Sequence, residues 1–362
     1  MSPEVVFVGH GAERSGPPVY LDHLVGWLAA HTDLDLATAV VRGGPLVEAY
    51  RAHGPTRVLA DGPAVAIAQA GLRRLAGESG SQRARQRWLR RRLGDWVDAP
   101  AVYVNTVSEP TLAVLAEVAP TATVVLHVHE LEAALRYGID DDGRRLIRQR
   151  PDHVVAASQA VADNLVERHG LDPDRIVVHH EFVRPVAPPT DDERRRERHR
   201  LGIGEDAFLV VGSGMLEWRK APDLFVRLAA DLRARTDREA AFVWVGGTDR
   251  GPLWAPLDHE ARHLGVEDVV RFVGAVDDPG RWFRLADAFV LTSREDAFPL
   301  AALEAASAEV PVITFDTGGM VELVGEIAPE AVVAYPDTVA MAEVLAGLAG
   351  DEARRADLAA GF

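Results

Sequence analysis

The sequence predicts an α/β protein made of two doubly wound domains in tandem. Its 362 residues are enough for about two domains of ordinary size. Short apolar runs rich in β-branched residues alternate with stretches whose apolar residues recur at helical spacing. The alternation stops once, at a proline-rich and then charged stretch, and restarts after it. Several of the apolar runs are nearly continuous, as expected for parallel strands covered by helices on both faces.

The first domain is expected over residues 1–184. Its helical pattern is clearest at Leu21, Leu24, Val25 and Leu28, which indicate a helix after the first strand. The expected strands, in chain order, are Val5–Val8, Leu36–Val41, Arg57–Ala60, Ala101–Asn105, Thr123–His129, His153–Ala157 and Ile176–His180.

Residues 185–200 are expected to form a linker, because several prolines precede a run of charged residues there. The second domain is expected over residues 201–362. Most of its helices should begin near a proline, a residue that the first helical turn tolerates. The expected helix starts are Pro222, Pro256, Pro279, Pro299 and Val321, and the expected strands are Phe208–Val211, Ala241–Val245, Val269–Val273, Ala288–Leu291, Pro311–Phe315 and Ala331–Ala334.

The composition excludes several classes of protein and site. A formal net charge of −16 argues against an electrostatic grip on nucleic acid. The absence of cysteine excludes disulfides and thiolate metal sites, and no His, Asp and Glu set has ligand spacing, so no metal is expected. The first apolar run is short and lacks preceding basic residues, and no stretch approaches the ~20 apolar residues of a membrane helix. We therefore expect a cytoplasmic protein.

One segment departs from this acidic composition. Between Arg73 and Arg92 there are eight arginines and one acid, Glu78, with apolar residues interleaved. The simpler interpretation is a solvated helix with a loop. The alternative is a basic amphipathic surface for peripheral contact with an anionic membrane or a phosphorylated acceptor.

Of the 39 lysine and arginine residues, only Lys220 is a lysine. It follows an apolar strand and the turn formed by Gly212 and Gly214, and it stands next to Arg219. Exposed N–H groups of a strand-to-helix turn, a guanidinium and a compact ammonium suit a diphosphate. The turn is not the dinucleotide fingerprint, because Glu217 occupies the position where that motif needs its third glycine.

A second motif follows the fourth expected strand of the second domain. Asp296 lies at the apex of a loop, a helix begins near Pro299, and Glu304 falls in the second helical turn. The N–H groups of Phe298 and Leu300 lie at the helix N-terminus, where phosphate oxygens are favoured. The carboxylate of Glu304 can accept hydrogen bonds from two vicinal ribose hydroxyls. The simpler interpretation is a capped helix whose acids face solvent.

A third motif, Pro-Val-Ile followed by Asp-Thr-Gly-Gly and Glu, spans residues 311–322. In the first half, a glycine-bearing loop covers residues 9–18, and a histidine-bearing strand end covers residues 127–132. Together these motifs resemble the family 4 (group 1) glycosyltransferases over nearly the whole chain. The resemblance implies the GT-B fold, in which two Rossmann-like domains face each other across a cleft, and transfer with retention of anomeric configuration.

The resemblance also implies a role for each matching residue. Arg219 and Lys220 would hold the donor diphosphate and neutralise it as it leaves, and Glu304 would bind the nucleotide ribose. Asp296 would face the hydroxyls of the donor sugar. His129, at the exit of its strand, would reach the transferred sugar from the other domain. The remaining donor-binding positions are Gly16, Gly212, Gly214, Val273, Phe298, Pro299 and Leu300.

Some positions differ from the family pattern. Asp296 stands where glutamate is usual, and Ala221 stands where glycine commonly follows the lysine. The chain ends at Phe362, whereas family members usually continue with a segment that packs back on the first domain. His127 shares a strand face with His129 and is expected to pack inside rather than to contact substrate.

By this resemblance the chain is a metal-independent hexosyltransferase. Its co-substrate would be a nucleoside-diphosphate sugar, no cofactor is implied, and the acceptor would be a hydroxyl of a glycan, glycolipid or secondary metabolite. Two alternatives stay open. One is a nucleotide-sugar epimerase or hydrolase on the same fold. The other is a non-catalytic protein that binds a nucleotide sugar and scaffolds or activates a partner.

Overall fold

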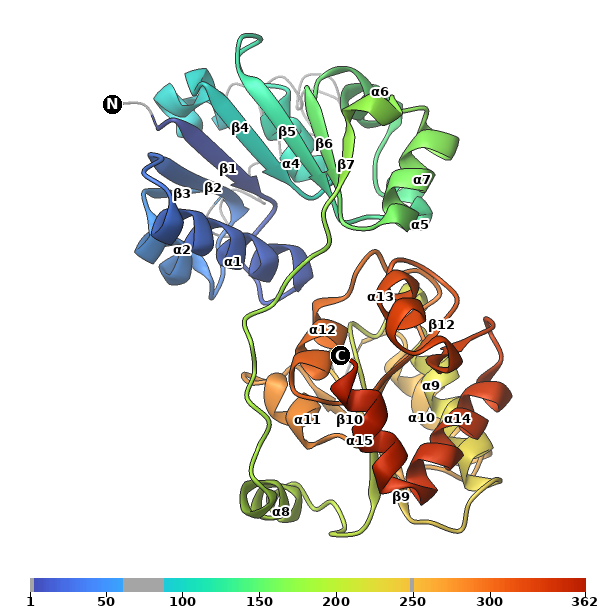
Figure 1. Ribbon diagram of the computed structural model, residues 1–362. Coiled ribbons are helices and arrows are strands. Elements are labelled where there is room, and N and C mark those ends of the chain that lie inside the picture. The colour runs from blue at the N-terminus through green and yellow to red at the C-terminus, as the bar shows by residue number, and fades with distance from the viewer. Residues whose placement is uncertain (1–2, 61–87, 248–250) are drawn as a thin grey trace. The chain divides into compact units, whose positions relative to one another are not determined.

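The computed structural model describes residues 3–60, 88–247 and 251–362 (Figure 1). The chain divides into two compact units, Met1–Glu181 (unit 1) and Phe182–Phe362 (unit 2), which are described separately below. The basic segment Arg73–Arg92 lies outside the described residues except for positions 88–92.

Unit 1 is built on a parallel sheet with the strand order β3-β2-β1-β4-β5-β6-β7. Neighbouring strands run in register, so that Gly9 of β1 pairs with Asn105 of β4. Each strand expected from the sequence is present, with its ends shifted by at most two residues. The strands are β1 Val5–Gly9, β2 Leu36–Arg42, β3 Thr56–Ala60, β4 Ala101–Asn105, β5 Thr123–Val128, β6 His153–Ala156 and β7 Ile176–Val178.

The helices of unit 1 begin where the sequence supplies N-terminal signals. Helix α1 opens on Gly16 with two prolines in its first turn, and α4 is preceded by a capping box between Ser108 and Thr111. The helices that lie wholly within the described residues are α1 Gly16–His31, α2 Val47–His53, α4 Glu109–Leu115, α5 Glu132–Tyr137, α6 Asp141–Gln149 and α7 Gln159–His169, with 3₁₀ turns at Gly94–Asp98 and Pro173–Arg175.

The range expected as a linker is not irregular throughout. Helix α8 (Asp191–Arg200) occupies its second half, where the sequence interpretation saw only a charge run. Thr190 and Glu193 form a capping box, and Arg194 and Arg198 on the same helix pair with Asp287 of unit 2. The charged residues therefore stabilise this helix within unit 2, because acids precede bases along it and two of its arginines share the Asp287 carboxylate.

Unit 2 repeats the architecture with a parallel sheet in the order β10-β9-β8-β11-β12-β13. Strand β8 ends two residues later than expected and includes Gly212. The strands are β8 Phe208–Ser213, β9 Ala240–Val245, β10 Val270–Gly274, β11 Ala288–Leu291, β12 Val312–Phe315 and β13 Val332–Val333.

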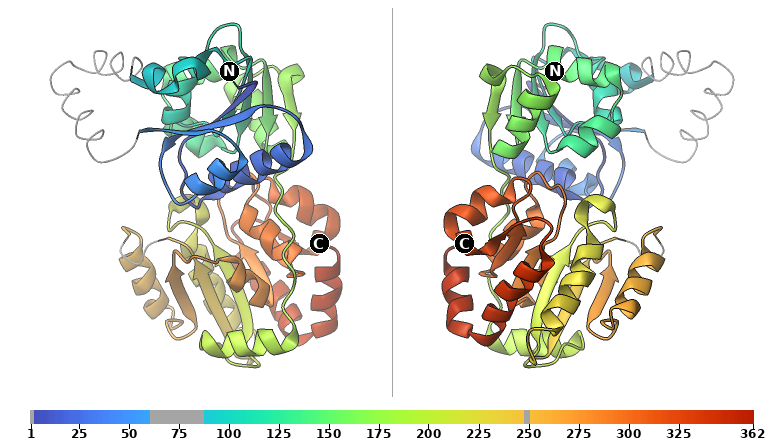
Figure 2. Two further views of the ribbon diagram at one scale, coloured as in Figure 1. Left: turned by 90° about the vertical axis from the view of Figure 1, so that its left-hand side faces the viewer. Right: turned by 90° about the vertical axis from the view of Figure 1, so that its right-hand side faces the viewer.

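Helices flank both faces of this second sheet (Figure 2). Helix α9 packs beside α10 and α14, and α11 packs beside α12 (Figure 1). The helices of unit 2 after α8 are α9 Pro222–Arg233, α10 Trp254–His263, α11 Gly280–Leu285, α12 Leu300–Ser307, α13 Met320–Ile327, α14 Thr338–Gly350 and α15 Glu352–Ala360, with 3₁₀ turns at Trp218–Lys220 and Pro329–Ala331.

An aromatic core underlies the carboxyl end of strand β8. The ring of Phe225 meets the rings of Phe242 and Trp244 edge to face, and all three side chains are buried. The Phe225 ring lies against Gly212, where a Cβ atom would come within 2.9 Å of it. This close approach fixes the start of the turn that carries Lys220.

Among the described residues, no helix is long and apolar enough to cross a membrane.

Candidate functional site

In unit 2 the strand order reverses between β8 and β11. The two strands are hydrogen-bonded neighbours, and Phe289 of β11 pairs with Val211 of β8. Their carboxyl ends therefore lie at the same edge of the sheet. Open α/β sheets bind ligands at this kind of topological switch point. The two motifs singled out in the sequence are the loops that leave these two strands.

The loop after β8 is held tightly around Gly214. The backbone N–H of Gly214 donates to Val245, and the indole N–H of Trp244 donates to the Gly214 carbonyl at 3.0 Å. Gly214 has a φ of +151°, and a Cβ atom there would lie 2.9 Å from Cγ of Lys220. The lysine stem thus passes directly over a position where only glycine leaves room.

The charged groups of the two loops meet at Asp296. The Lys220 ammonium donates to Oδ2 of Asp296 at 2.5 Å, and the Ser293 hydroxyl donates to the same oxygen at 3.0 Å. The Arg219 guanidinium reaches Oδ1 at 3.3 Å and also bonds Glu217 at 2.9 Å. We call Arg219, Lys220, Ser293 and Asp296 the Asp296 cluster. This cluster joins the two sequence motifs. Its lysine and its aspartate are 76 residues apart in the chain.

Asp296 is almost fully enclosed, with 8% of its surface exposed. Burial by itself would raise the pKa of its carboxyl group, but the charges of Lys220 and Arg219 hold that pKa below its ordinary value. Asp296 is therefore an ionised, buried carboxylate. The main chain around it is also fixed, because Gly319 donates its N–H to the Asp296 carbonyl at 3.0 Å.

Helix α12 begins directly after this loop. Pro299 is its N-cap, and Phe298, Pro299 and Leu300 are buried. The first N–H groups of a helix have no acceptor inside the helix, so they point a partial positive charge toward the loop. The Asp296 cluster and this helix start together form an edge suited to phosphate oxygens.

Glu304 lies one turn further along α12 and behaves differently from Asp296. Its carboxyl group has no hydrogen-bond or ion-pair partner among the described residues. Burial, together with the nearby carboxylate of Asp278, raises the pKa of Glu304 to about 7. A half-buried acid without such a partner retains its capacity to accept hydrogen bonds from a ligand.

In unit 1, His129 lies just beyond the end of β5, and its side chain is 2% exposed. Its Nδ1 pairs with Glu181, and its Nε2 lies 2.9 Å from Oδ1 of Asn105. Asn105 in turn donates to the Pro17 carbonyl at 2.9 Å, which fixes the orientation of its amide. Both ring nitrogens of His129 are thus engaged inside unit 1, and a sugar hydroxyl would have to replace one of these partners.

The other unit 1 residues named from the sequence occupy different environments. His127 is buried with Nδ1 2.7 Å from the Tyr103 hydroxyl, and its burial holds its pKa well below the usual range. Gly16, by contrast, is exposed at the start of α1 with open space beside its Cα.

Val273 stands in β10, on the far side of β9 from β8. It is half-buried at a register shift in the pairing with β9. The adjoining Gly274 adopts a φ of +71° and accepts from the Gly246 N–H at 2.8 Å. The donor-binding position expected at Val273 therefore lies at an irregular strand end that offers backbone groups.

Sequence reasoning missed Ser293, Glu181 and Asn105 as members of these networks. Asn105 was visible as a polar residue at a strand end, which is where ligand-contacting residues gather in such sheets. Ser293 lies only three residues before its partner Asp296, inside the same loop. Glu181 carried no local signal, because its partner His129 lies 52 residues earlier in the chain.

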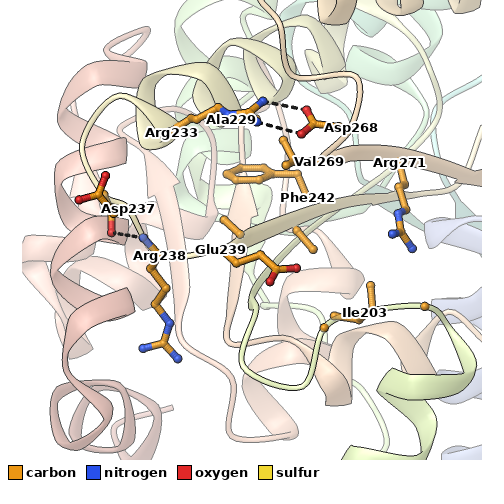
Figure 3. A pocket seen from close by; sticks show the side chains of 15 residues that line it. Ile203, Ala229, Arg233, Asp237, Arg238, Glu239, Phe242, Asp268, Val269 and Arg271 are labelled. Atoms are coloured by element: carbon orange, nitrogen blue, oxygen red, sulfur yellow. Dashed lines mark hydrogen bonds and ion pairs between the residues drawn. The ribbon is translucent and has the colours of Figure 1, made fainter.

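A separate pocket of about 590 Å³ opens at the opposite, amino-terminal edge of the unit 2 sheet (Figure 3). Arg233 and Asp268 form a bidentate pair at its wall, and Arg238, Glu239 and Arg271 also line it. Its position away from the strand carboxyl ends separates it from the Asp296 cluster.

Among the described residues, no group of His, Asp and Glu side chains is arranged to hold a metal ion.

Two protein families match adjoining parts of the chain. The family described as "Glycosyl transferases group 1" matches residues 193–360, and "Glycosyltransferase Family 4" matches residues 15–187. Two relatives with similar sequences are also named as glycosyltransferases. "D-inositol 3-phosphate glycosyltransferase 2" of Catenulispora acidiphila is 34% identical over 244 residues, or 62% of this chain and 56% of that protein. "D-inositol 3-phosphate glycosyltransferase" of Streptomyces scabiei is 33% identical over 225 residues, or 60% of this chain and 50% of that protein.

This chain spans about half the length of these curated relatives. Among solved structures, Anabaena HepE in complex with UDP and glucose superimposes with a TM-score of 0.76 at 17% identity, covering 99% of this chain and 93% of the other. Sucrose-phosphate synthase of Thermosynechococcus elongatus gives a TM-score of 0.77 at 18% identity, covering 99% and 92%. These likenesses confirm the GT-B fold, and with the family matches they show that the chain belongs to the family 4, group 1 glycosyltransferases.

Proposed function

We propose that this protein transfers a sugar from a nucleoside-diphosphate sugar to an acceptor hydroxyl with retention of anomeric configuration. The observation that carries the proposal is the position of Lys220 at the switch point of the unit 2 sheet, beside the N-terminus of α12. Membership of the family supports the reaction class. The structural neighbour from Anabaena was crystallised with UDP-glucose, which supports this type of donor.

The transfer requires one bond to break and one to form at the anomeric carbon. The bond from that carbon to the diphosphate oxygen breaks, and the electron pair leaves with the diphosphate. The acceptor oxygen forms its new bond on the same face, and its proton passes to the departing phosphate oxygen. The largest assistance is then expected from charges and N–H dipoles directed at the leaving oxygens, each donor contributing ~10²–10³ in rate.

Lys220 and the first turn of α12 are the groups that would supply this assistance. The ammonium has three donors, and only one is used on Asp296. Arg219 already bonds Glu217, the Glu295 carbonyl and Asp296, so its charge acts from a fixed place beside the lysine. Phe298, Pro299 and Leu300 would line the phosphates and the sugar.

Glu304 would bind the nucleotide ribose. Its side chain is half-buried on α12 without a partner among the described residues, and an ionised carboxylate there can accept from both ribose hydroxyls. On unit 1, Gly16 would admit the donor, and His129 would contact the transferred sugar by exchanging one of its present partners. Gly212, Gly214 and Val273 would contribute backbone contacts.

The experiment that tests this proposal has two stages. Thermal unfolding of the full chain is first measured with a panel of nucleoside diphosphates and nucleotide sugars, because a ligand that binds the folded state raises the apparent Tm. Turnover is then assayed with the sugar nucleotide that stabilises most. The acceptor panel includes inositol 3-phosphate, since the relatives are named for it, and chelator is added to half the assays to test metal independence.

Lys220→Met and Arg233→Ala form a matched pair for this assay. Each removes one positive charge, but Arg233 is exposed at the opposite edge of the sheet, where it pairs with Asp268. We expect Lys220→Met to lower turnover by at least a hundredfold and Arg233→Ala to leave it unchanged. Equal turnover in both variants would contradict the proposal.

Other outcomes would favour the alternatives raised by the sequence. Conversion of the nucleotide sugar without any acceptor would indicate an epimerase or hydrolase. Donor binding without turnover, restored by a partner protein, would indicate a scaffolding role. The basic segment Arg73–Arg92 is proposed to contact an anionic acceptor or membrane, which vesicle co-sedimentation with anionic and neutral lipid tests directly.

A further inference from the structure

Both oxygens of the Asp296 carboxylate already accept hydrogen bonds from side chains of the same chain. Oδ2 accepts from Lys220 at 2.5 Å and from Ser293 at 3.0 Å, and Oδ1 accepts from Arg219 at 3.3 Å. The side chain is 10% exposed. The Asp296 carboxylate therefore faces Lys220 and Arg219. Its role therefore differs from the one that the family resemblance assigns, which is to face the hydroxyls of the donor sugar.

Four charged side chains contact one another around this carboxylate. Lys220 and Arg219 carry two positive charges, and Asp296 and Glu217 carry two negative ones. The next cation along the loop, Arg294, is itself paired with Asp223 at 2.6 Å. The edge that should receive a diphosphate thus has no net charge from these groups, although its cations are correctly placed.

The geometry also fixes where the ammonium lies. The lysine stem is confined on one side by Gly214, where a Cβ would come within 2.9 Å of it. The Asp296 main chain is confined on the other side, because a Cβ on Gly318 would lie 2.0 Å from the Asp296 carbonyl oxygen. Lysine and aspartate therefore meet between two rigid loops, and the short aspartate stem sets the position of the ammonium.

We propose that Asp296 is a positioning residue and counter-ion for Lys220, which sets the affinity of the site for a diphosphate. The inference rests on the proposed function. Without ligand, Asp296 holds the ammonium in place and neutralises it. With ligand, the lysine is shared between Asp296 and a phosphate oxygen, and the carboxylate repels the diphosphate. This repulsion weakens binding of the nucleoside-diphosphate product and assists its release.

The discriminating variant is Asp296→Asn, which keeps the size of the side chain and one acceptor but removes the charge. We expect the Kd for free nucleoside diphosphate to fall by about tenfold, because a unit charge beside the phosphates acts at a few ångströms in a partly buried site. The Kd for the nucleotide sugar should fall by a similar factor. The kcat should fall as product release slows, with a lower KM. A gain in affinity cannot come from loss of structure.

Asp268→Asn is the matched control. It makes the same exchange at an exposed ion pair at the opposite edge of the sheet, so its nucleoside-diphosphate Kd should stay within about twofold of the wild type. If Asp296→Asn instead weakens only the nucleotide sugar, Asp296 is a sugar ligand and the inference is wrong. Unchanged or weaker binding of the free nucleoside diphosphate by folded Asp296→Asn also overturns it.

Should Asp296→Asn fail to fold, the wild-type protein still provides the test. A charge-balanced site predicts that the Kd for nucleoside diphosphate changes by less than about threefold between low and high salt. A steep loss of affinity with salt would overturn the inference. If the wild type bound no nucleoside diphosphate at all, the proposed function itself would fail. That outcome differs from a Kd that rises instead of falling in Asp296→Asn.

Discussion

The stem of Lys220 lies against Gly214, so closely that a Cβ atom on the glycine would come within 2.9 Å of the lysine Cγ and 3.0 Å of its Cδ. Gly214 also has a φ of +151°, which L side chains rarely adopt. The glycine of this turn is therefore required for the lysine to reach Asp296, in addition to any contact that its backbone makes with a ligand.

Gly214→Ala should displace the Lys220 ammonium and weaken nucleoside-diphosphate binding by about tenfold or more, while costing about 1–3 kcal/mol of stability. Calorimetric titration and chemical denaturation measure the two effects. Gly350→Ala is the control, because its added Cβ would meet open space at an ordinary φ. Unaltered binding by Gly214→Ala would show that the lysine position does not depend on this contact.

Lys220→Arg tests why an arginine-rich chain keeps one lysine. A planar guanidinium on a longer stem should pair with Asp296 through two nitrogens and leave the position where a compact ammonium meets phosphate. We expect kcat to fall at least tenfold with little change in Tm. The converse exchange Arg233→Lys, at an exposed pair, should change neither. Full turnover by Lys220→Arg would make the lone lysine a matter of composition only.

The pairing of Lys220 with Asp296 also predicts a coupling in stability. Removing one partner of this pair leaves the other charge only partly compensated, by Arg219 in the case of Asp296, so Lys220→Met and Asp296→Asn should each cost up to about 3–5 kcal/mol. The double variant should cost clearly less than the sum, because neither charge is then left alone. Urea unfolding of the four proteins completes the cycle. Additive costs would mean that the 2.5 Å contact contributes little in solution.

Glu181 provides a fourth test, in unit 1. Its carboxylate pairs with His129 Nδ1, and the side chains of both residues are almost fully buried. Glu181→Ala should destabilise unit 1 by about 2–4 kcal/mol, because a buried ring nitrogen loses its acceptor. Glu181→Gln keeps an acceptor and should cost less. Hydrogen exchange of the β4 and β5 amides locates the effect, and equal losses in both variants would show that an acceptor alone does not replace the carboxylate.

Much of the fold could be predicted from local pattern. Strands such as Ala288–Leu291 are continuous apolar runs, because helices cover both faces of the sheet. Proline marked the start of α9 correctly, since that residue fits a first helical turn. Helix α8 was missed, although the Thr190-x-x-Glu193 capping box was a readable signal in the charge run.

The candidate site could be predicted only in part. Lys220 and Asp296 were each found from the loop in which they stand, but their contact was not, because they are 76 residues apart and the strand order brings them together. The same reason hid Glu181, which pairs with a histidine 52 residues earlier. Local motifs therefore locate the loops of such a site, whereas the sheet topology determines which charges neutralise one another.

Glu304 connects the site to pH. Its pKa in the folded protein is about 7, above the ordinary value of 4.5, so the fold prefers the protonated acid. Stability is then unaffected below about pH 4.5 and falls as the pH rises from there through about 7. The loss is at most about 3 kcal/mol. Glu304→Gln cannot ionise, so the variant should match the wild type at pH 4 and exceed it in stability at pH 8.

Nucleotide binding should show the opposite trend, because only the ionised Glu304 carboxylate can accept from both ribose hydroxyls. With a pKa of about 7, the ionised fraction rises about tenfold between pH 6 and pH 8, and the affinity for nucleoside diphosphate should rise by a similar factor. Glu304→Gln serves as the reference, since it retains the titration of the phosphates alone. Titration calorimetry at both pH values gives the comparison. Parallel pH dependence in the two proteins would show that Glu304 does not bind the ribose.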